Sequence, residues 1–131
     1  MVLLRHDTPD GSFHHDFMVQ FNGPGSPLAT WRVKDRIHEL VVGDYGASFW
    51  AEPLGDHRAD YLTYQGEVSG NRGRVTRIAE GLVHLPHPET LVATDQVVFQ
   101  ATWRTGPNRN RLKFSGARDS GGQWLFSVIR V

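Results

Sequence analysis

The chain has 131 residues, and its 14 basic and 14 acidic side chains give a formal net charge of zero. A zero net charge excludes the broad positive field that draws proteins to long nucleic acids or to membranes, and the absence of cysteine excludes a disulfide framework, a thiolate nucleophile and a zinc ribbon. The length fits one domain, residues 1–131, whose core needs no covalent support.

Short runs of β-type residues follow one another along the chain, separated by turn residues. The predicted strands are residues 2–5, 13–21, 28–33, 48–51, 61–68, 74–78, 81–84, 96–103, 111–115 and 124–131. Between them lie the segments "NGPGSP", "SGNRG", "TGPNRN" and "DSGG", which supply the positive φ angles and preset turns that loops need. One segment, "TWRVKDRIHELV" at residues 30–41, is also compatible with an amphipathic helix.

So many short strands in a chain of this length favour an all-β fold. A compact closed β-barrel of about eight strands, with short loops and at most one short helix, leaves no exposed sheet edge to aggregate. No apolar run reaches membrane-spanning length, and the first residues lack a signal-peptide core. We therefore expect a soluble, cytoplasmic protein that makes no contact with a membrane, and we take it to be a monomer.

The strand predicted at residues 13–21, "FHHDFMVQF", has two chemically different faces, because side chains alternate along a strand. The apolar face, which we expect in the core, comprises Phe13, His15, Phe17, Val19 and Phe21. The other face comprises His14, Asp16, Met18 and Gln20. On this second face an imidazole and a carboxylate lie two residues apart, close enough for both to reach one ion or one water.

A third candidate ligand precedes this strand. The turn-like segment "DTPDGS" joins two predicted strands, so a hairpin would bring His6 to face His14 and Asp16. Two imidazoles and one carboxylate suit a divalent ion such as Mn²⁺ or Zn²⁺. A surface histidine and a local hydrogen-bonded pair are the ordinary structural interpretation of the same residues.

Two further groups have the composition of a functional site. In "DHRADY", His57 and Tyr61 lie four residues apart, with Arg58 beside His57; ordinary loop packing explains them equally well. The segment "GNRGRVTR" carries guanidinium groups that could bind a phosphate bidentately, or that form a solvated strand face. Its arginines are Arg72, Arg74 and Arg77. The histidines at 38, 84 and 87 have no partner at a useful spacing, and we interpret them as structural.

Taken together, the motifs resemble a known family. They are "LLRHD", "HHDFMVQ", "LATWRVK", "DHRADYLTYQGEVSGNRGRVTR" and "LKFSGARDSGGQWLFSVIR", and they span nearly the whole chain. The chain resembles the 3′-phosphoesterase domain of bacterial DNA ligase D proteins, also described as the DNA polymerase ligase N-terminal domain. The resemblance implies a β-barrel that removes a 3′-phosphate or a 3′-ribonucleotide with Mn²⁺ in DNA end repair.

The resemblance also implies residue roles. It makes His6, His14 and Asp16 the metal ligands and His57 and Tyr61 the later catalytic pair. We expect the face with His14 and Asp16 to look into the open mouth of the barrel, His57 to protonate the leaving oxygen and Tyr61 to donate a hydrogen bond to the phosphate. Several arginines could hold the phosphate, and the sequence does not choose among them. The first candidates are Arg58, Arg72 and Arg74, and Arg5, Arg32 and Arg77 are also in strands or turns that could border the mouth.

The chain departs from the family pattern at three points, which suggests a small, stand-alone, divergent member. The gap between His6 and His14 is two residues longer than in the family. Met18 stands where the motif has an arginine, and methionine can neither carry charge nor donate a hydrogen bond. Gly55 replaces an acidic residue before Asp56.

Met18 and Gly55 favour the first of two alternatives to an active enzyme, and the second does not depend on them. The first is a catalytically weakened or inactive module of the same fold that binds nucleic-acid ends or a DNA repair ligase or polymerase. The second is a barrel that binds an unrelated small anion. The zero net charge favours recognition of a nucleic-acid 3′ end, where few phosphates are contacted, over a long duplex.

Overall fold

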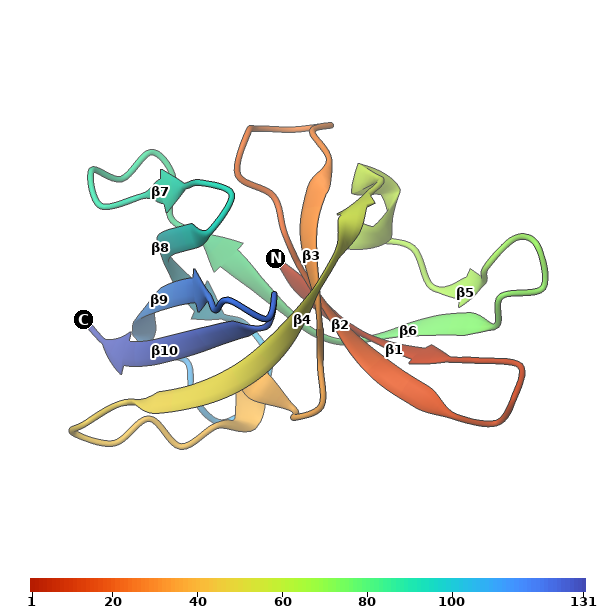
Figure 1. The fold of residues 1–131 in the computed structure, drawn as a ribbon, viewed down its shortest axis with the longest axis horizontal. Coiled ribbons are helices and arrows are strands. Elements are labelled where there is room, and N and C mark those ends of the chain that lie inside the picture. The colour runs from red at the N-terminus through yellow and green to blue at the C-terminus, as the bar shows by residue number, and fades with distance from the viewer.

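The alternating sequence pattern builds one continuous antiparallel sheet, which the computed structural model describes over all 131 residues (Figure 1). Its strands are β1 (Val2–Asp7), β2 (Phe13–Val19), β3 (Leu28–Val33), β4 (Ala47–His57), β5 (Gly66–Glu67), β6 (Arg74–Val83), β7 (Leu91–Val92), β8 (Gln96–Trp103), β9 (Arg111–Arg118) and β10 (Trp124–Arg130). Two short 3₁₀ segments are η1 (Ile37–Glu39) and η2 (Ala59–Leu62). No helix has the length and apolar character needed to span a membrane.

Eight of the strands form a closed ring in the order β6-β1-β2-β3-β4-β10-β9-β8, because β6 pairs with β8 as well as with β1. The two-residue strands β5 and β7 pair with β6 and β8. In Figure 1, β4 runs across the molecule, between the β1–β2 hairpin on the right and β8 to β10 on the left. The prediction of a closed all-β fold of about eight strands is confirmed.

Aromatic side chains fill the inside of the ring. Phe17 of β2 lies among them, with its ring centroid 5.9 to 6.4 Å from those of six others. The six are Trp31, Phe49, Phe99, Trp103, Phe114 and Phe126. His15 is buried on the same face of β2, and its Nδ1 lies 3.2 Å from the Lys34 carbonyl oxygen, as expected for a core histidine.

The opposite face of β1 and β2 is covered as well. Residues 58–73, which we call the covering segment, contain η2 and β5 and fold across this face. They bury a second apolar cluster, comprising Val2, Leu4, Met18, Leu28, Val68 and Val75, against which Tyr61 and Leu62 pack. Strand β2 is therefore buried on both faces, and the side chains of its second face lie between the ring and the covering segment.

Some predicted details are wrong. Residues 61–68 form no single strand, because Tyr61 and Leu62 both pack on the second cluster in a 3₁₀ turn, which alternation along a strand would prevent. The helix considered at residues 30–41 is not formed, since β3 pairs with strands on both sides as far as Val33. Phe13, expected in the core, is 52% exposed beside the hairpin turn, and the Arg5 guanidinium packs on its ring.

The β1–β2 turn fixes the register that the site depends on. Oδ1 of Asp10 accepts hydrogen bonds from the hydroxyl of Thr8 at 2.5 Å and from the hydroxyl and amide nitrogen of Ser12 at 2.6 and 3.0 Å. These bonds stabilise the charged form and lower the pKa of Asp10 to about 2. With the turn held in this way, His6 lies directly opposite His14 in the β1–β2 ladder.

Candidate metal centre

The β1–β2 hairpin gathers three possible metal ligands on its outer face. His6 of β1 faces His14 of β2, and Asp16 follows two residues along β2 on the same face. Nε2 of His14 lies 3.2 Å from Oδ1 of Asp16, and Nδ1 of His6 lies 3.9 Å from Oδ2. One ligand atom from each residue lies within 4.8 Å of the others, so the group could hold a metal ion.

A hydrogen bond from His6 leaves one of its nitrogens free to bind a metal. Its Nε2 lies 2.6 Å from the carbonyl oxygen of Arg72, and because a carbonyl only accepts, Nε2 carries the proton. Nδ1, on the side of Asp16, therefore has a free lone pair. Metal-binding histidines commonly donate their other N–H to a carbonyl or carboxylate in this way, which fixes the ring.

The Asp16 carboxylate also fits a bound cation. It is 3% exposed, and its buried Oδ1 has no hydrogen-bond partner. Burial raises the pKa of Asp16, although the positive charges of the neighbouring imidazoles and of Arg32 oppose that rise. Burial likewise lowers the pKa of His14, which favours the neutral imidazole that binds metals. A divalent ion bound between the two imidazoles and Asp16 would offset the cost of burying this carboxylate.

Gly73 allows the covering segment to approach the hairpin closely enough to orient His6. Its φ is +95°, and a Cβ added there would lie 1.9 Å from the carbonyl oxygen of Asp7. Only glycine avoids this overlap of main-chain and side-chain atoms. The close approach brings the carbonyl of Arg72 to the His6 ring, so a residue from 66 positions away completes the site.

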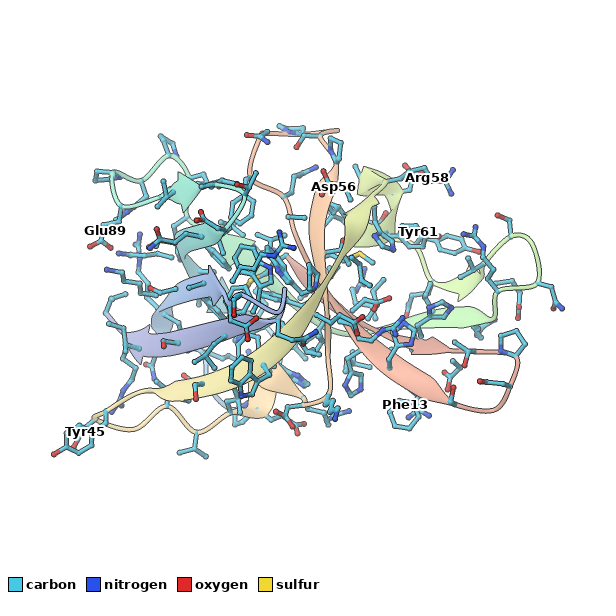
Figure 2. The ribbon with its side chains drawn as sticks, viewed as in Figure 1. Phe13, Tyr45, Asp56, Arg58, Tyr61 and Glu89 are labelled. Carbon is cyan, nitrogen blue, oxygen red and sulfur yellow. The ribbon has the colours of Figure 1, made fainter.

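Two of the three candidate ligands, His6 and Asp16, border a cleft of about 400 Å³. The cleft is lined by His6, Asp16, Met18, Asp56, His57, Arg58, Tyr61, Val68, Ser69, Arg72 and Val75. Figure 2 shows Asp56 towards the end of β4 and Arg58 and Tyr61 on the segment that follows it. The structure thus places side chains from β1, β2, β4 and the covering segment around one hollow.

The predicted catalytic pair lies together in this cleft. The His57 and Tyr61 rings meet edge to face, with their centroids 5.8 Å apart. Nδ1 of His57 donates a hydrogen bond to the Gly55 carbonyl at 2.8 Å, so Nε2 is the nitrogen that can accept or release a proton. His57 and Tyr61 line the same cleft as two of the candidate ligands, His6 and Asp16.

The candidate arginines separate into two groups. Arg58 and Arg72 line the cleft, and Arg72 is held by hydrogen bonds from Nε and Nη2 to Ser69 at 2.6 and 3.2 Å. Arg74 lies outside the cleft and forms an ion pair with Glu67 at 3.5 Å. Arg77 is turned towards the Leu62 carbonyl, and Arg5 is paired with Asp7.

The cleft is not the mouth of the barrel, which corrects the expected orientation. The residues of β2 that point into the ring are those of the aromatic core, and strand alternation sends His14 and Asp16 to the outer face. What makes this outer face concave is the covering segment. The carbonyl of Arg72 and the carboxylate of Asp56 belong to the surroundings of the site, and the spacing of residues in the sequence gave no signal for either.

The cluster predicts a stabilising effect of divalent ions. Mn²⁺ is expected to raise the melting temperature, because an ion present at a hundred times its Kd stabilises the folded state by about 2.7 kcal/mol. His14→Ala should lose this shift, and His87→Ala, which removes a histidine outside the cleft, should keep it. Asp16→Asn separates ion binding from folding, since it removes a buried charge and should lose the shift without lowering the metal-free melting temperature. Equal shifts in wild type and His14→Ala would contradict the assignment.

No protein-family model matches this chain, and no curated protein matches it.

Proposed function

We propose that the protein is a Mn²⁺-dependent 3′-phosphoesterase that removes a 3′-phosphate or a 3′-ribonucleotide from nucleic-acid ends during DNA repair in the cytoplasm. The observation that carries the proposal is that His6 and Asp16 share one cleft with His57, Tyr61 and Arg58. A metal site, a proton donor and phosphate-binding groups are the parts that such a reaction needs. The motif resemblance supports the choice of substrate.

The proposed metal site is His6, His14 and Asp16, with Mn²⁺ as the proposed ion. A bound Mn²⁺ would act as a Lewis acid that polarises a phosphoryl oxygen. Two nitrogens and one oxygen also suit Zn²⁺, so the resemblance rather than the donor set favours manganese. The Arg72 carbonyl holds His6 in the tautomer that leaves Nδ1 available.

The remaining side chains have separate proposed roles. For a 3′-phosphate, water adds to phosphorus, the bond between phosphorus and the 3′ oxygen breaks, and the products are a 3′-hydroxyl and inorganic phosphate. His57, with both ring nitrogens protonated, gives its Nε2 proton to the departing 3′ oxygen, and the proton that the attacking water loses returns to Nε2. The Tyr61 hydroxyl donates a hydrogen bond to the phosphoryl group. Arg58 and Arg72 bind the phosphate oxygens.

The charges around the cleft suit a terminal phosphate. Two aspartates and two arginines line it, so their formal charges cancel before an ion binds. A divalent ion would make the cleft positive only locally, which fits one dianionic group better than a long duplex. Proteins that make or seal such ends, a repair polymerase or ligase, are the proposed partners.

The experiment is a primer assay. Strands that end in a 3′-phosphate, a single 3′-ribonucleotide or a plain 3′-hydroxyl are incubated with wild type and with Asp16→Asn, with Mn²⁺ or with a chelator. We expect shortened or dephosphorylated product from the first two strands only, and only with wild type and Mn²⁺. Absence of product at high enzyme and Mn²⁺ would contradict the proposal.

The alternative is a binding module of the same fold. One observation favours it: Met18, at the position of the family's arginine, is 1% exposed and packs in the second apolar cluster at the wall of the cleft, so β2 brings no guanidinium to the cleft. In the primer assay, this alternative corresponds to primer binding without product. A binding module that keeps the metal site would still show the metal-induced rise in melting temperature.

A further inference from the structure

A second hollow lies on the outer face of β3 and β4, one strand away from the metal cleft. It encloses about 430 Å³, and its lining includes Arg32, Lys34, Asp35, Trp50, Glu52 and Gln123. Arg32 is the direct β2–β3 partner of Asp16, and adjacent strands lie about 4.8 Å apart. We call this hollow the β3–β4 groove.

Arg32 lies opposite Asp16 in the β2–β3 ladder, but its side chain forms no ion pair. Its Nε is buried without a hydrogen-bond partner, and none of the salt bridges includes it. Glu52 is its neighbour across β3 and β4, yet the two side chains form no ion pair. A half-buried guanidinium that forms no direct ion pair keeps its fork of donors free, and this fork matches the oxygens of a phosphate.

Trp50 gives the groove an aromatic surface. It is 58% exposed, whereas the other three tryptophans, Trp31, Trp103 and Trp124, are at most 4% exposed. An exposed indole beside basic side chains is the combination that binds single-stranded nucleic acid, because bases stack on the ring while phosphates meet the cations. Lys34 provides a second cation, and the acidic Asp35 and Glu52 limit the attraction to a short stretch of backbone.

We propose that the β3–β4 groove binds the nucleotide preceding the 3′ end of a single strand, with its phosphate on Arg32 and Lys34 and its base stacked on Trp50. This inference rests on the proposed function, because it takes the processed end to lie in the neighbouring metal cleft. The groove then sets the polarity with which a strand enters. It also explains how a protein of zero net charge selects a strand end.

Binding is tested first, without any catalytic step. A labelled single-stranded DNA oligonucleotide with a 3′-hydroxyl is titrated by fluorescence anisotropy, and quenching of the exposed Trp50 is followed in parallel. Trp50→Ala is expected to weaken binding about tenfold, from the loss of one stacked base. Arg32→Gln is expected to weaken binding. It should also reduce the slope of log K against log salt concentration by about 0.7, the change that corresponds to the loss of one phosphate contact. Trp50→Ala should leave that slope unchanged.

Arg104→Gln, which removes an exposed arginine outside both hollows, is the matched control and should bind like wild type. Thermal melting of each variant confirms that it is folded. The proposal that the groove binds a nucleotide is overturned if wild type does not bind the oligonucleotide. It is also overturned if wild type, Trp50→Ala and Arg32→Gln bind equally well.

A second measurement separates the groove from the proposed reaction. If hydrolysis occurs, Trp50→Ala should raise KM for a primer with a 3′-phosphate and leave hydrolysis of a nucleoside 3′-phosphate, which is too short to reach the groove, unchanged. Equal loss on both substrates would contradict the groove. If no hydrolysis occurs, the proposed function fails, and the binding data still decide whether the groove binds a nucleotide.

Discussion

Replacing His57 with alanine is expected to lower the rate of 3′-phosphate release by about 10²- to 10⁴-fold, the range for loss of a general acid or base. The reason is its position: Nδ1 is committed to the Gly55 carbonyl, so Nε2 is available for proton transfer within the cleft. The side chain is not part of either apolar cluster, so the fold should survive the change. Because His57 is not one of the three candidate ligands, Mn²⁺ should still raise the melting temperature of His57→Ala.

The leaving group provides the control for this prediction. An aryl phosphate whose leaving oxygen is a weak base needs no proton, so the rate on this substrate should fall much less in His57→Ala than the rate on a 3′-phosphate. His87→Ala should match wild type on both substrates. Equal losses on the two phosphates would show that His57 acts otherwise than as a proton donor.

Met18→Arg is expected to destabilise the fold by about 3 kcal/mol or more, because it places a charge within the second apolar cluster, at the wall of the cleft. Strand alternation alone suggests that an arginine here would reach the phosphate beside the ion. In the structure, however, Met18 is 1% exposed and packs with Leu4, Leu28 and Val68 beneath the covering segment. An arginine at this position would have to displace residues that hold the cleft together.

Urea unfolding of Met18→Arg and Met18→Leu measures this effect. Leucine has a similar volume and should cost less than about 1.5 kcal/mol. We expect 3′-end hydrolysis to follow the same order, with the arginine variant lower than the leucine variant. Equal stability of the two variants would show that the covering segment opens readily, and a gain in hydrolysis with arginine would show that its guanidinium reaches the cleft.

Local sequence features determined most of the strands and the main parts of the site. The alternation in residues 13–21 placed His14 and Asp16 on one face, and the turn after Asp7 predicted a hairpin with His6 opposite them. The four-residue spacing of His57 and Tyr61 matched a pair of rings in contact. Closure of about eight strands followed from the number of short β-type runs in one small domain.

The tertiary structure decided what covers each face and which groups complete the site. Alternation divides β2 into two faces but does not say which of them meets a second layer, because that depends on packing between residues far apart in the chain. The contact of the Arg72 carbonyl with His6 spans 66 positions and relies on the close approach at Gly73. In the same way, only the register of β2, β3 and β4 sets Arg32 between Asp16 and Glu52, where it forms an ion pair with neither.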